Sequence, residues 1–253
     1  MEIGLVQYNP VWEDKSKNKE KLNTLFFDKK RVEKLLIFPE MTLTGFTMKA
    51  SLFAESLEGE SCSYFAGLAV SNNAHILAGI IEKRDGKFYN SLIHLNPEGK
   101  LEKVYRKIHP FSLSSENKSY TRGTEFAITI IEEWRAGLSI CYDLRFPELF
   151  RQYGKNRAEL IIVIANWPVA RIEHWKTLLK SRAIENQCYV AGVNRVGSDL
   201  KLKYNGFSSV YDPMGDEVIS RENSEAILSA DISIDNCNRI RSELPFLNDI
   251  FLI

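Results

Sequence analysis

The sequence lacks an excess of charge of either sign. Lys and Arg together number 33, as do Asp and Glu, so the 253 residues carry no formal net charge. Without a basic surplus the chain has no general attraction to a phosphate backbone, and we expect no nucleic-acid partner. No run approaches the roughly 18 uninterrupted apolar residues that cross a bilayer, and the first residues do not resemble a signal peptide. We therefore expect no membrane partner and a cytoplasmic location.

Metal and nucleotide motifs are also missing. The four histidines have neither the HxH nor the HExxH spacing of a zinc site, and no GxGxxG or GxxxxGKS loop is present. We therefore expect no metal and no cofactor. An even cysteine count is compatible with disulfides, but a chain of this length does not need them, so reduced thiols are the favoured interpretation. The cysteines lie far apart, at Cys62, Cys141, Cys188 and Cys237.

Short apolar runs alternate with longer amphipathic stretches. This alternation predicts an α/β protein with both parallel and hairpin elements. No linker rich in glycine, serine or proline divides the chain, so residues 1–253 are interpreted as a single domain. The tail beyond Asp231 has no clear pattern and is a candidate for contact with another subunit. Strands are predicted at 2–8, 35–38, 75–83, 88–95, 101–106, 126–131, 136–140, 160–165, 189–196, 207–213, 216–220 and 226–232, and helices at 14–33, 59–73, 146–154 and 171–187.

Four polar residues follow the carboxyl ends of predicted strands, where ligands collect in α/β proteins. They are Glu40, Lys107, Cys141 and Asn166. Cys141 separates an apolar run from a predicted helix that begins near Phe146. Oriented N–H groups at a helix N-terminus stabilise a thiolate and lower its pKa. We therefore expect a reactive thiol at Cys141; the alternative is a small buried hydrophobe.

Glu40 and Lys107 supply the other two groups that amide chemistry needs. Glu40 is a candidate base for the thiol proton, because partial burial raises the pKa of a carboxyl group. The ammonium of Lys107 is suited to holding an oxyanion. Taken alone, each residue is better explained as an ordinary charge at a surface or helix start. A thiol protease would instead pair Cys141 with a histidine, for which His109 and His174 are available, although neither spacing is diagnostic.

Three segments, taken in order, resemble the signature blocks of the nitrilase superfamily of carbon–nitrogen hydrolases. They are LIFPEMTLTGF, YRKIHPF and GLSICYDLRFPELFR. The resemblance extends over nearly the whole chain, from VQYNPVWED to VYDPMGDEV. The TGF, ENKSYTRG and NWPVARIEHW segments look most like the bacterial omega-amidase branch. The resemblance implies a four-layer α-β-β-α sandwich, with helices outside two packed sheets, and a homodimer or larger homo-oligomer.

The resemblance also implies catalytic residues. The family's Glu–Lys–Cys triad falls on Glu40, Lys107 and Cys141. A second family glutamate, between the lysine and the cysteine, matches Glu116 better than Glu125. The implied reaction is covalent hydrolysis of an amide through a thioester of the cysteine.

The implied substrate is a small-molecule amide, namely the terminal amide of a dicarboxylate monoamide such as 2-oxoglutaramate or 2-oxosuccinamate. The backbone N–H of Tyr142 is expected to join Lys107 in holding the oxyanion. Asn166 and Trp167 are expected to line the pocket, with a strand-end turn and a core aromatic as the alternatives. Arg171 is a candidate for the substrate carboxylate, with a solvated helix-start arginine as its alternative.

Other interpretations remain open. Tyr142, Asp143 and Arg145 are expected to brace the turn at the cysteine rather than touch substrate. Pro110 stands where many relatives have leucine, so the loop that carries Lys107 is expected to differ in detail. The same triad also serves N-carbamoyl and aliphatic amide hydrolysis, whereas nitrile hydrolysis is less favoured because the chain lacks the extensions common in nitrilases. A catalytically silent scaffold protein is a further alternative.

Overall fold

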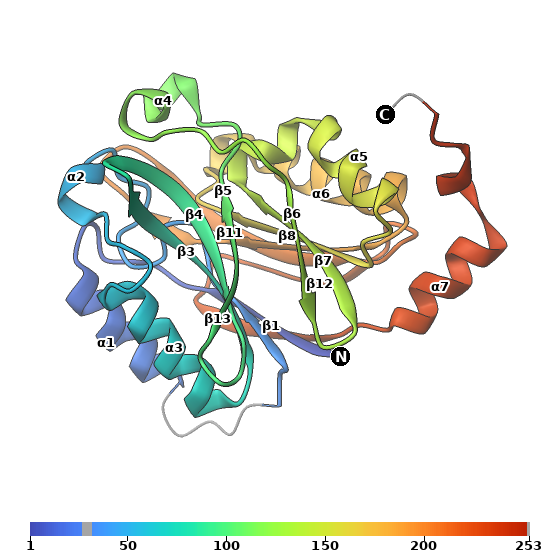
Figure 1. The fold of residues 1–253 in the computed structure, drawn as a ribbon, viewed down its shortest axis with the longest axis horizontal. Helices are drawn as coiled ribbons and strands as arrows, with labels where there is room; N and C mark the ends of the chain where they lie inside the picture. Colours follow the sequence, from blue (N-terminus) through green and yellow to red (C-terminus); the bar gives the residue numbers. More distant parts are fainter. Residues whose placement is uncertain (27–31, 252–253) are drawn as a thin grey trace.

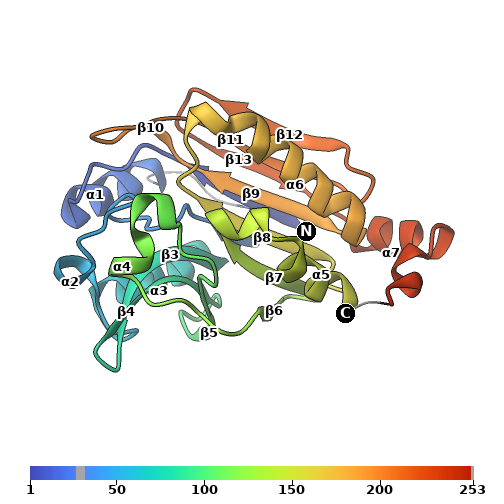
Figure 2. The same ribbon diagram turned by 90° about the horizontal axis from the view of Figure 1, so that it is seen from above.

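The computed structural model describes residues 1–26 and 32–251, which form two β-sheets and the helices that cover them (Figures 1 and 2). The first sheet has the spatial order β13 (Ala226–Asp231), β1 (Glu2–Gln7), β2 (Leu35–Ile37), β3 (His75–Arg84), β4 (Lys87–Leu95) and β5 (Leu101–Arg106). The second has the order β10 (Val196–Ser198), β11 (Lys203–Tyr211), β9 (Tyr189–Asn194), β8 (Leu160–Ala165), β7 (Trp134–Ile140) and β6 (Ala127–Ile131), and β12 (Glu217–Glu222) also pairs with β11.

Each sheet is mixed, as the sequence predicts. The central strands β1, β2 and β3 run parallel, as do β7, β8 and β9. The outer strands join them by antiparallel pairing, including the β3–β4 hairpin that turns at Asp85-Gly86. Parallel strands end at the same edge of a sheet, so the residues that follow the neighbouring strands β7 and β8 lie close together.

The strands alternate between two buried faces. Ile3 and Leu5 of β1 pack with residues of the second sheet, whereas Val6 packs with Leu22 and Phe65 of the helices on the outer side. This period of two is what a strand covered on both faces requires. The helices α1 (Lys15–Phe26) and α3 (Glu60–Asn72) cover the first sheet, and α5 (Pro147–Lys155) and α6 (Ile172–Asn186) cover the second (Figures 1 and 2). The predicted α-β-β-α sandwich is confirmed.

The helix predicted over 14–33 is α1; residues 27–31 of that range lie outside the described residues. Two short helices, α2 (Ala50–Phe53) and α4 (Glu116–Ser119), lie in loops. Within residues 1–26 and 32–251, none of the helices has the length and apolarity that crossing a membrane demands.

The tail beyond Asp231 contains a helix that the sequence analysis missed. This helix, α7 (Ile234–Glu243), projects from the sandwich with the C-terminal segment (Figure 1). The Ser233 hydroxyl accepts a hydrogen bond from the Asn236 N–H, which is a standard N-cap. Arg241 donates to the carbonyls of Gln187 and Ala158 and so ties the helix to the second sheet. The serine cap was the available sequence signal.

A buried histidine pair lies between the sheets. His94 of β4 is fully buried, and its ring contacts His75 of β3 at 2.9 Å and the hydroxyl of Thr129 in β6 at 2.7 Å. Burial, and secondarily the neighbouring His75, lowers the pKa of His94 to about 3. Burial also lowers the pKa of His75. Both rings are therefore neutral at pH 7.

This pair predicts a loss of stability in acid. An unfolded histidine titrates near pH ~6.5, so below that pH the unfolded chain binds a proton that folded His94 refuses. The contribution of neutral His94 to the free energy of unfolding is therefore complete above pH ~6.5. It decreases as the pH falls towards 3, by up to about 1.4 kcal/mol per pH unit. Urea unfolding of wild type and His94→Gln between about pH 7.5 and 4.5 should show the steeper decline in wild type. Equal slopes would contradict the assignment.

Candidate active site

Cys141 occupies a strained turn at the end of β7. Its φ is 50°, in the left-handed region that residues other than glycine rarely adopt. A 3₁₀ turn, Cys141–Arg145, follows directly. The buried carboxylate of Asp143 accepts hydrogen bonds from the Ile140 N–H, the Tyr105 hydroxyl and the His109 N–H, and thus holds this turn. The predicted bracing role of Asp143 agrees with these contacts.

Glu40, Lys107 and Glu116 form one buried charged cluster. The Lys107 ammonium lies 2.8 Å from Glu40 Oε1 and 2.9 Å from Glu116 Oε2. The side chains of all three are at most 1% exposed. Glu116 begins α4, and its second contact is the Phe111 N–H at 2.6 Å. Glu125, the alternative match, is exposed and is not part of these contacts.

The opposite charges of the cluster stabilise one another. Burial alone would lower the pKa of Lys107, but the carboxylates of Glu116 and Glu40 outweigh it and hold that pKa well above its usual range. Burial raises the pKa of Glu116, against the opposing effect of the Lys107 ammonium. Two carboxylates against one ammonium leave an excess of negative charge next to Cys141 when both are ionised.

The pKa of Cys141 is raised well above its usual range, so the expected lowering is wrong. Burial is the largest cause, and the carboxylates of Glu40 and Glu116 add to it. The Lys107 ammonium and the Asn166 backbone N–H act in the opposite direction without overcoming these effects. The sequence argument counted the N–H groups of the following turn and could not count the carboxylates. At neutral pH the resting side chain is a thiol.

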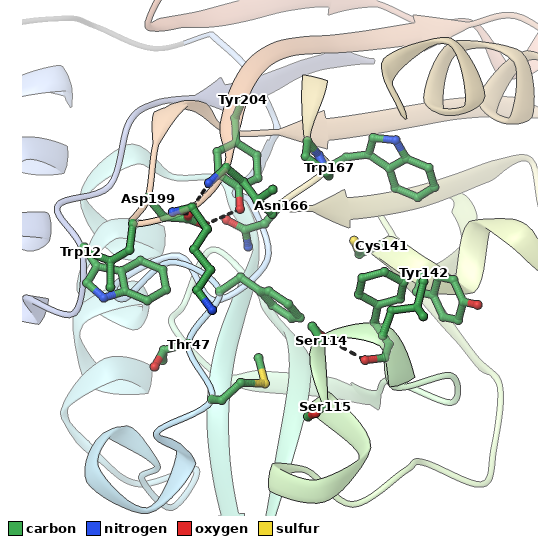
Figure 3. Close-up of a pocket in the computed structure, with 18 of the residues that line it drawn as sticks. Trp12, Thr47, Ser114, Ser115, Cys141, Tyr142, Asn166, Trp167, Asp199 and Tyr204 are labelled. Atoms are coloured by element: carbon green, nitrogen blue, oxygen red, sulfur yellow. Dashed lines mark hydrogen bonds between the residues drawn. The ribbon is translucent and has the colours of Figure 1, made fainter. Parts of the chain in front are cut away.

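Cys141 opens on a cavity of about 790 Å³. Figure 3 shows Cys141, Tyr142 and Trp167 on one side of it and Trp12, Asp199 and Tyr204 on the other. Glu40, Lys107 and Glu116 are not among the residues that line it, and their side chains have almost no exposed surface. A solute in the cavity therefore reaches the sulfur directly while the charges stay protected from bulk water.

Asn166 and Trp167 line the cavity. The Asn166 N–H donates to Glu40 Oε2 at 2.9 Å, and its Nδ2 donates to the Glu40 carbonyl at 2.7 Å. A carbonyl only accepts, so Nδ2 must face Glu40. Among the described residues, Asn166 Oδ1 has no hydrogen-bond partner. The Trp167 indole donates to the Arg171 carbonyl at 2.7 Å, which ties strand end and helix start together.

Two guanidinium groups border the cavity. Arg171 lies over the ring of Phe111 at 5.6 Å and Arg145 over the ring of Trp167 at 4.8 Å. Burial, and secondarily the charge of Arg171, lowers the pKa of Arg145. Within the described ranges, neither forms an ion pair with a carboxylate. The expectation that Arg145 only braces the turn is therefore incomplete, because its side chain also borders the cavity.

Neither histidine considered for a thiol protease is paired with the cysteine in the described structure. His109 donates its backbone N–H to Asp143, and its ring stacks on Phe146 with centroids 3.8 Å apart. His174 contacts Arg145 at 3.2 Å. Across the described residues there is also no group of three or more histidine, cysteine, aspartate or glutamate side chains arranged to hold a metal ion.

Asn90 of β4 was missed by the sequence analysis. Its Nδ2 lies 2.7 Å from Glu40 Oε1 and 2.8 Å from Glu116 Oε1. It sits in the middle of a strand and belongs to none of the quoted signature blocks. The only sequence signal was a polar residue in a largely apolar run.

Fold and site together define a class of protein. Residues 2–242 match the family model described as Carbon-nitrogen hydrolase, so the chain belongs to the carbon-nitrogen hydrolase family. This match spans both sheets and every residue of the charged cluster.

Individual relatives narrow the class. The chain is 30% identical to 2-oxoglutaramate amidase from Bacillus subtilis (strain 168), over 98% of this chain and 96% of that protein. It is 32% identical to omega-amidase YafV from Escherichia coli (strain K12), over 98% and 96%. The crystal structure of XC1258 from Xanthomonas campestris, a CN-hydrolase superfamily protein with an arsenic adduct in its active site, matches with a TM-score of 0.96 and 32% identity, over 100% and 98%. The chain is thus an amide-hydrolysing enzyme of the nitrilase superfamily, on its omega-amidase branch.

Proposed function

We propose that this enzyme hydrolyses the terminal amide of small dicarboxylate monoamides, of the 2-oxoglutaramate and 2-oxosuccinamate type, to a carboxylate and ammonia. The observation that carries the proposal is the buried Glu40–Lys107–Glu116 cluster directly behind a protonated thiol at a cavity wall. The names of the relatives from Bacillus subtilis and Escherichia coli support the substrate class.

Acylation needs a base, because the resting sulfur is protonated. Glu40 takes the proton of Cys141 through Oε2, the oxygen that does not bind Lys107, while the sulfur attacks the amide carbon. The carbonyl electrons move to oxygen, where the Lys107 ammonium and the Tyr142 backbone N–H hold the negative charge. When the intermediate collapses, the carbon–nitrogen bond breaks and Glu40 returns its proton to the nitrogen. Ammonia leaves and an acyl thioester remains on Cys141.

Deacylation reuses the same groups. Glu40, again a carboxylate, takes a proton from a water molecule that attacks the thioester carbon. The same donors hold the second oxyanion. The carbon–sulfur bond then breaks, the proton passes from Glu40 to the sulfur, and the carboxylic acid product leaves and ionises. One carboxyl group thus serves as base and acid in both halves.

Glu116 holds the Lys107 ammonium rather than exchanging protons with substrate. Its two oxygens lie 3.1 and 2.9 Å from Nζ, so it fixes the ammonium from the side opposite Glu40. Asn166 Oδ1, which lacks a partner in the described structure, is suited to accept an N–H of the substrate amide. Trp167 and Tyr142 form the apolar walls around it.

The substrate carboxylate binds between Arg171 and Arg145. Both guanidinium groups border the cavity near Cys141, and neither has a carboxylate partner among the described residues. Burial and, secondarily, the charge of Arg171 lower the pKa of Arg145, and an anion between the two guanidinium groups would relieve their mutual repulsion. This arrangement favours acidic amides over neutral ones.

The remaining features of the proposal concern the whole molecule. Residues 1–253 form a single carbon-nitrogen hydrolase domain, which the family match over 2–242 supports. The enzyme is cytoplasmic and acts as a homodimer or larger homo-oligomer. The projecting α7 segment, with Phe246 61% exposed, offers apolar surface for such contacts.

The proposal is tested by ammonia release from 2-oxoglutaramate. Wild type should turn over, and Cys141→Ala should show no turnover because no thioester can form. Lys107→Met should lower kcat by about 10²–10³, because it removes an oxyanion donor. Circular dichroism would establish that each variant is folded. Substantial activity in either folded variant, or failure of wild type on this substrate, would reject the respective assignment.

Replacing either arginine of the pair should affect the hydrolysis of acidic amides more than that of neutral ones. Arg171→Gln and Arg145→Gln should each lower kcat/KM for 2-oxoglutaramate by about 10–100-fold, because each removes a charged hydrogen bond to the substrate. Hydrolysis of butyramide, which has no carboxylate, should change little. Arg239→Gln in α7, whose side chain pairs with Glu243 on the surface, serves as the control. An equal loss on both amides would assign the arginines a structural role instead.

A further inference from the structure

Asn90 connects all three charged groups of the cluster. Its Nδ2 donates to Glu40 Oε1 at 2.7 Å and to Glu116 Oε1 at 2.8 Å. Its backbone carbonyl accepts the Lys107 N–H at 2.9 Å. The residue is 1% exposed. One asparagine therefore bridges two like-charged carboxylates and also anchors the chain that carries the ammonium between them.

The orientation of the Asn90 amide is determined by its partners. Ionised carboxylates only accept hydrogen bonds, so the NH₂ group must face them. Among the described residues, Oδ1 is then left without a partner although it is buried. An unpaired buried oxygen is destabilising, and an apolar side chain of similar size would avoid it. The retained amide thus contributes something other than stability.

The contacts divide the two oxygens of Glu40 between different tasks. Oε1 accepts from Asn90 and from Lys107. Oε2 accepts from the Asn166 N–H and has no bond to the ammonium. Without Asn90, the carboxylate could rotate so that both oxygens share the ammonium, which would draw the basic oxygen away from the sulfur.

We propose that Asn90 is a positioning residue that keeps Glu40 turned towards Cys141 and holds the two carboxyl groups of the cluster side by side. This inference rests on the proposed role of Glu40 as the base. It does not depend on which amide is the substrate. The Asn90 amide acts electrostatically. The single ammonium only partly offsets the repulsion between the two carboxylates, and two N–H bonds from the amide reduce this repulsion further.

Two substitutions separate positioning from packing. Asn90→Ala removes the donor, and Asn90→Asp keeps the shape but replaces the donor with a third acid. Each should lower kcat by about 10–100-fold with little change in KM, the range typical of residues that orient a reacting group. The acid limb of the pH profile of kcat/KM should move to higher pH, because loss of a donor to a carboxylate raises its pKa. Asn90→Asp should be the more impaired.

A second measurement needs no substrate. Alkylation of Cys141 by iodoacetamide also requires transfer of the thiol proton, so its pH dependence should shift upward in both Asn90 variants. If 2-oxoglutaramate proves not to be a substrate, this alkylation profile still tests Asn90. If Glu40 is not the base, Glu40→Gln will be alkylated at least as fast as wild type at neutral pH, because loss of the Glu40 charge lowers the pKa of the thiol. Slower alkylation of Glu40→Gln identifies Glu40 as the base, which separates failure of the proposed function from failure of this inference.

Asn186→Ala is the matched control. Asn186 is also fully buried and donates through Nδ2 to the Arg182 carbonyl, and its Oδ1 has no hydrogen-bond partner in the described part of the chain. It lies in α6, outside the cluster. The Asn186→Ala variant should be less stable than wild type, without a shift in the pH profile of kcat/KM or of Cys141 alkylation. Folded Asn90 variants with wild-type kcat and unshifted profiles would overturn the proposal. A fall in kcat that only follows the melting temperature, as expected for Asn186→Ala, would also overturn it. The same holds if both Asn90 variants fail to fold.

Discussion

The structure of the site depends on one buried ammonium held between two carboxylates. Lys107 lies within 2.9 Å of both Glu40 and Glu116, and none of the three has appreciable contact with water. Removing Lys107 would leave two buried carboxylates without a counter-charge, which is strongly destabilising. The cluster is therefore a unit, and its charges also affect the neighbouring sulfur. Burial of Cys141 favours the thiol over the thiolate, and the two carboxylates of the cluster add to this effect more than the one ammonium opposes it.

The residues of the charged cluster and Cys141 come from separate parts of the chain. Glu40 follows β2, Lys107 follows β5 and Cys141 follows β7, so both sheets contribute. The close approach of the Glu40 loop to β3 depends on Gly79, because a Cβ there would lie 2.5 Å from the Met41 nitrogen. The inner faces of the sheets exclude water around the cluster. In that setting each hydrogen bond is stronger than it would be at a surface, and the groups need little rearrangement during reaction.

Much of this arrangement could be predicted from the sequence, and the remainder has a physical explanation. Apolar runs such as 35–38 and 160–165 predicted buried strands, and the polar residues at their ends predicted where the site lies. The raised pKa of Cys141 could not be predicted, because it depends on burial of the sulfur in the folded protein and, secondarily, on carboxylates from distant segments. Asn90 and Arg145 were missed as site residues because side-chain direction within a strand or a 3₁₀ turn depends on tertiary packing.

The account can be tested most directly by titrating the Cys141 thiol. Thiolate absorbance near 240 nm, measured as the difference between wild type and Cys141→Ser across a pH series, reports this one sulfur. The account predicts no thiolate signal at neutral pH, with ionisation only above the ordinary thiol value of about 8.5. A thiolate already present at neutral pH would contradict it, because Glu40 would then have no proton to remove.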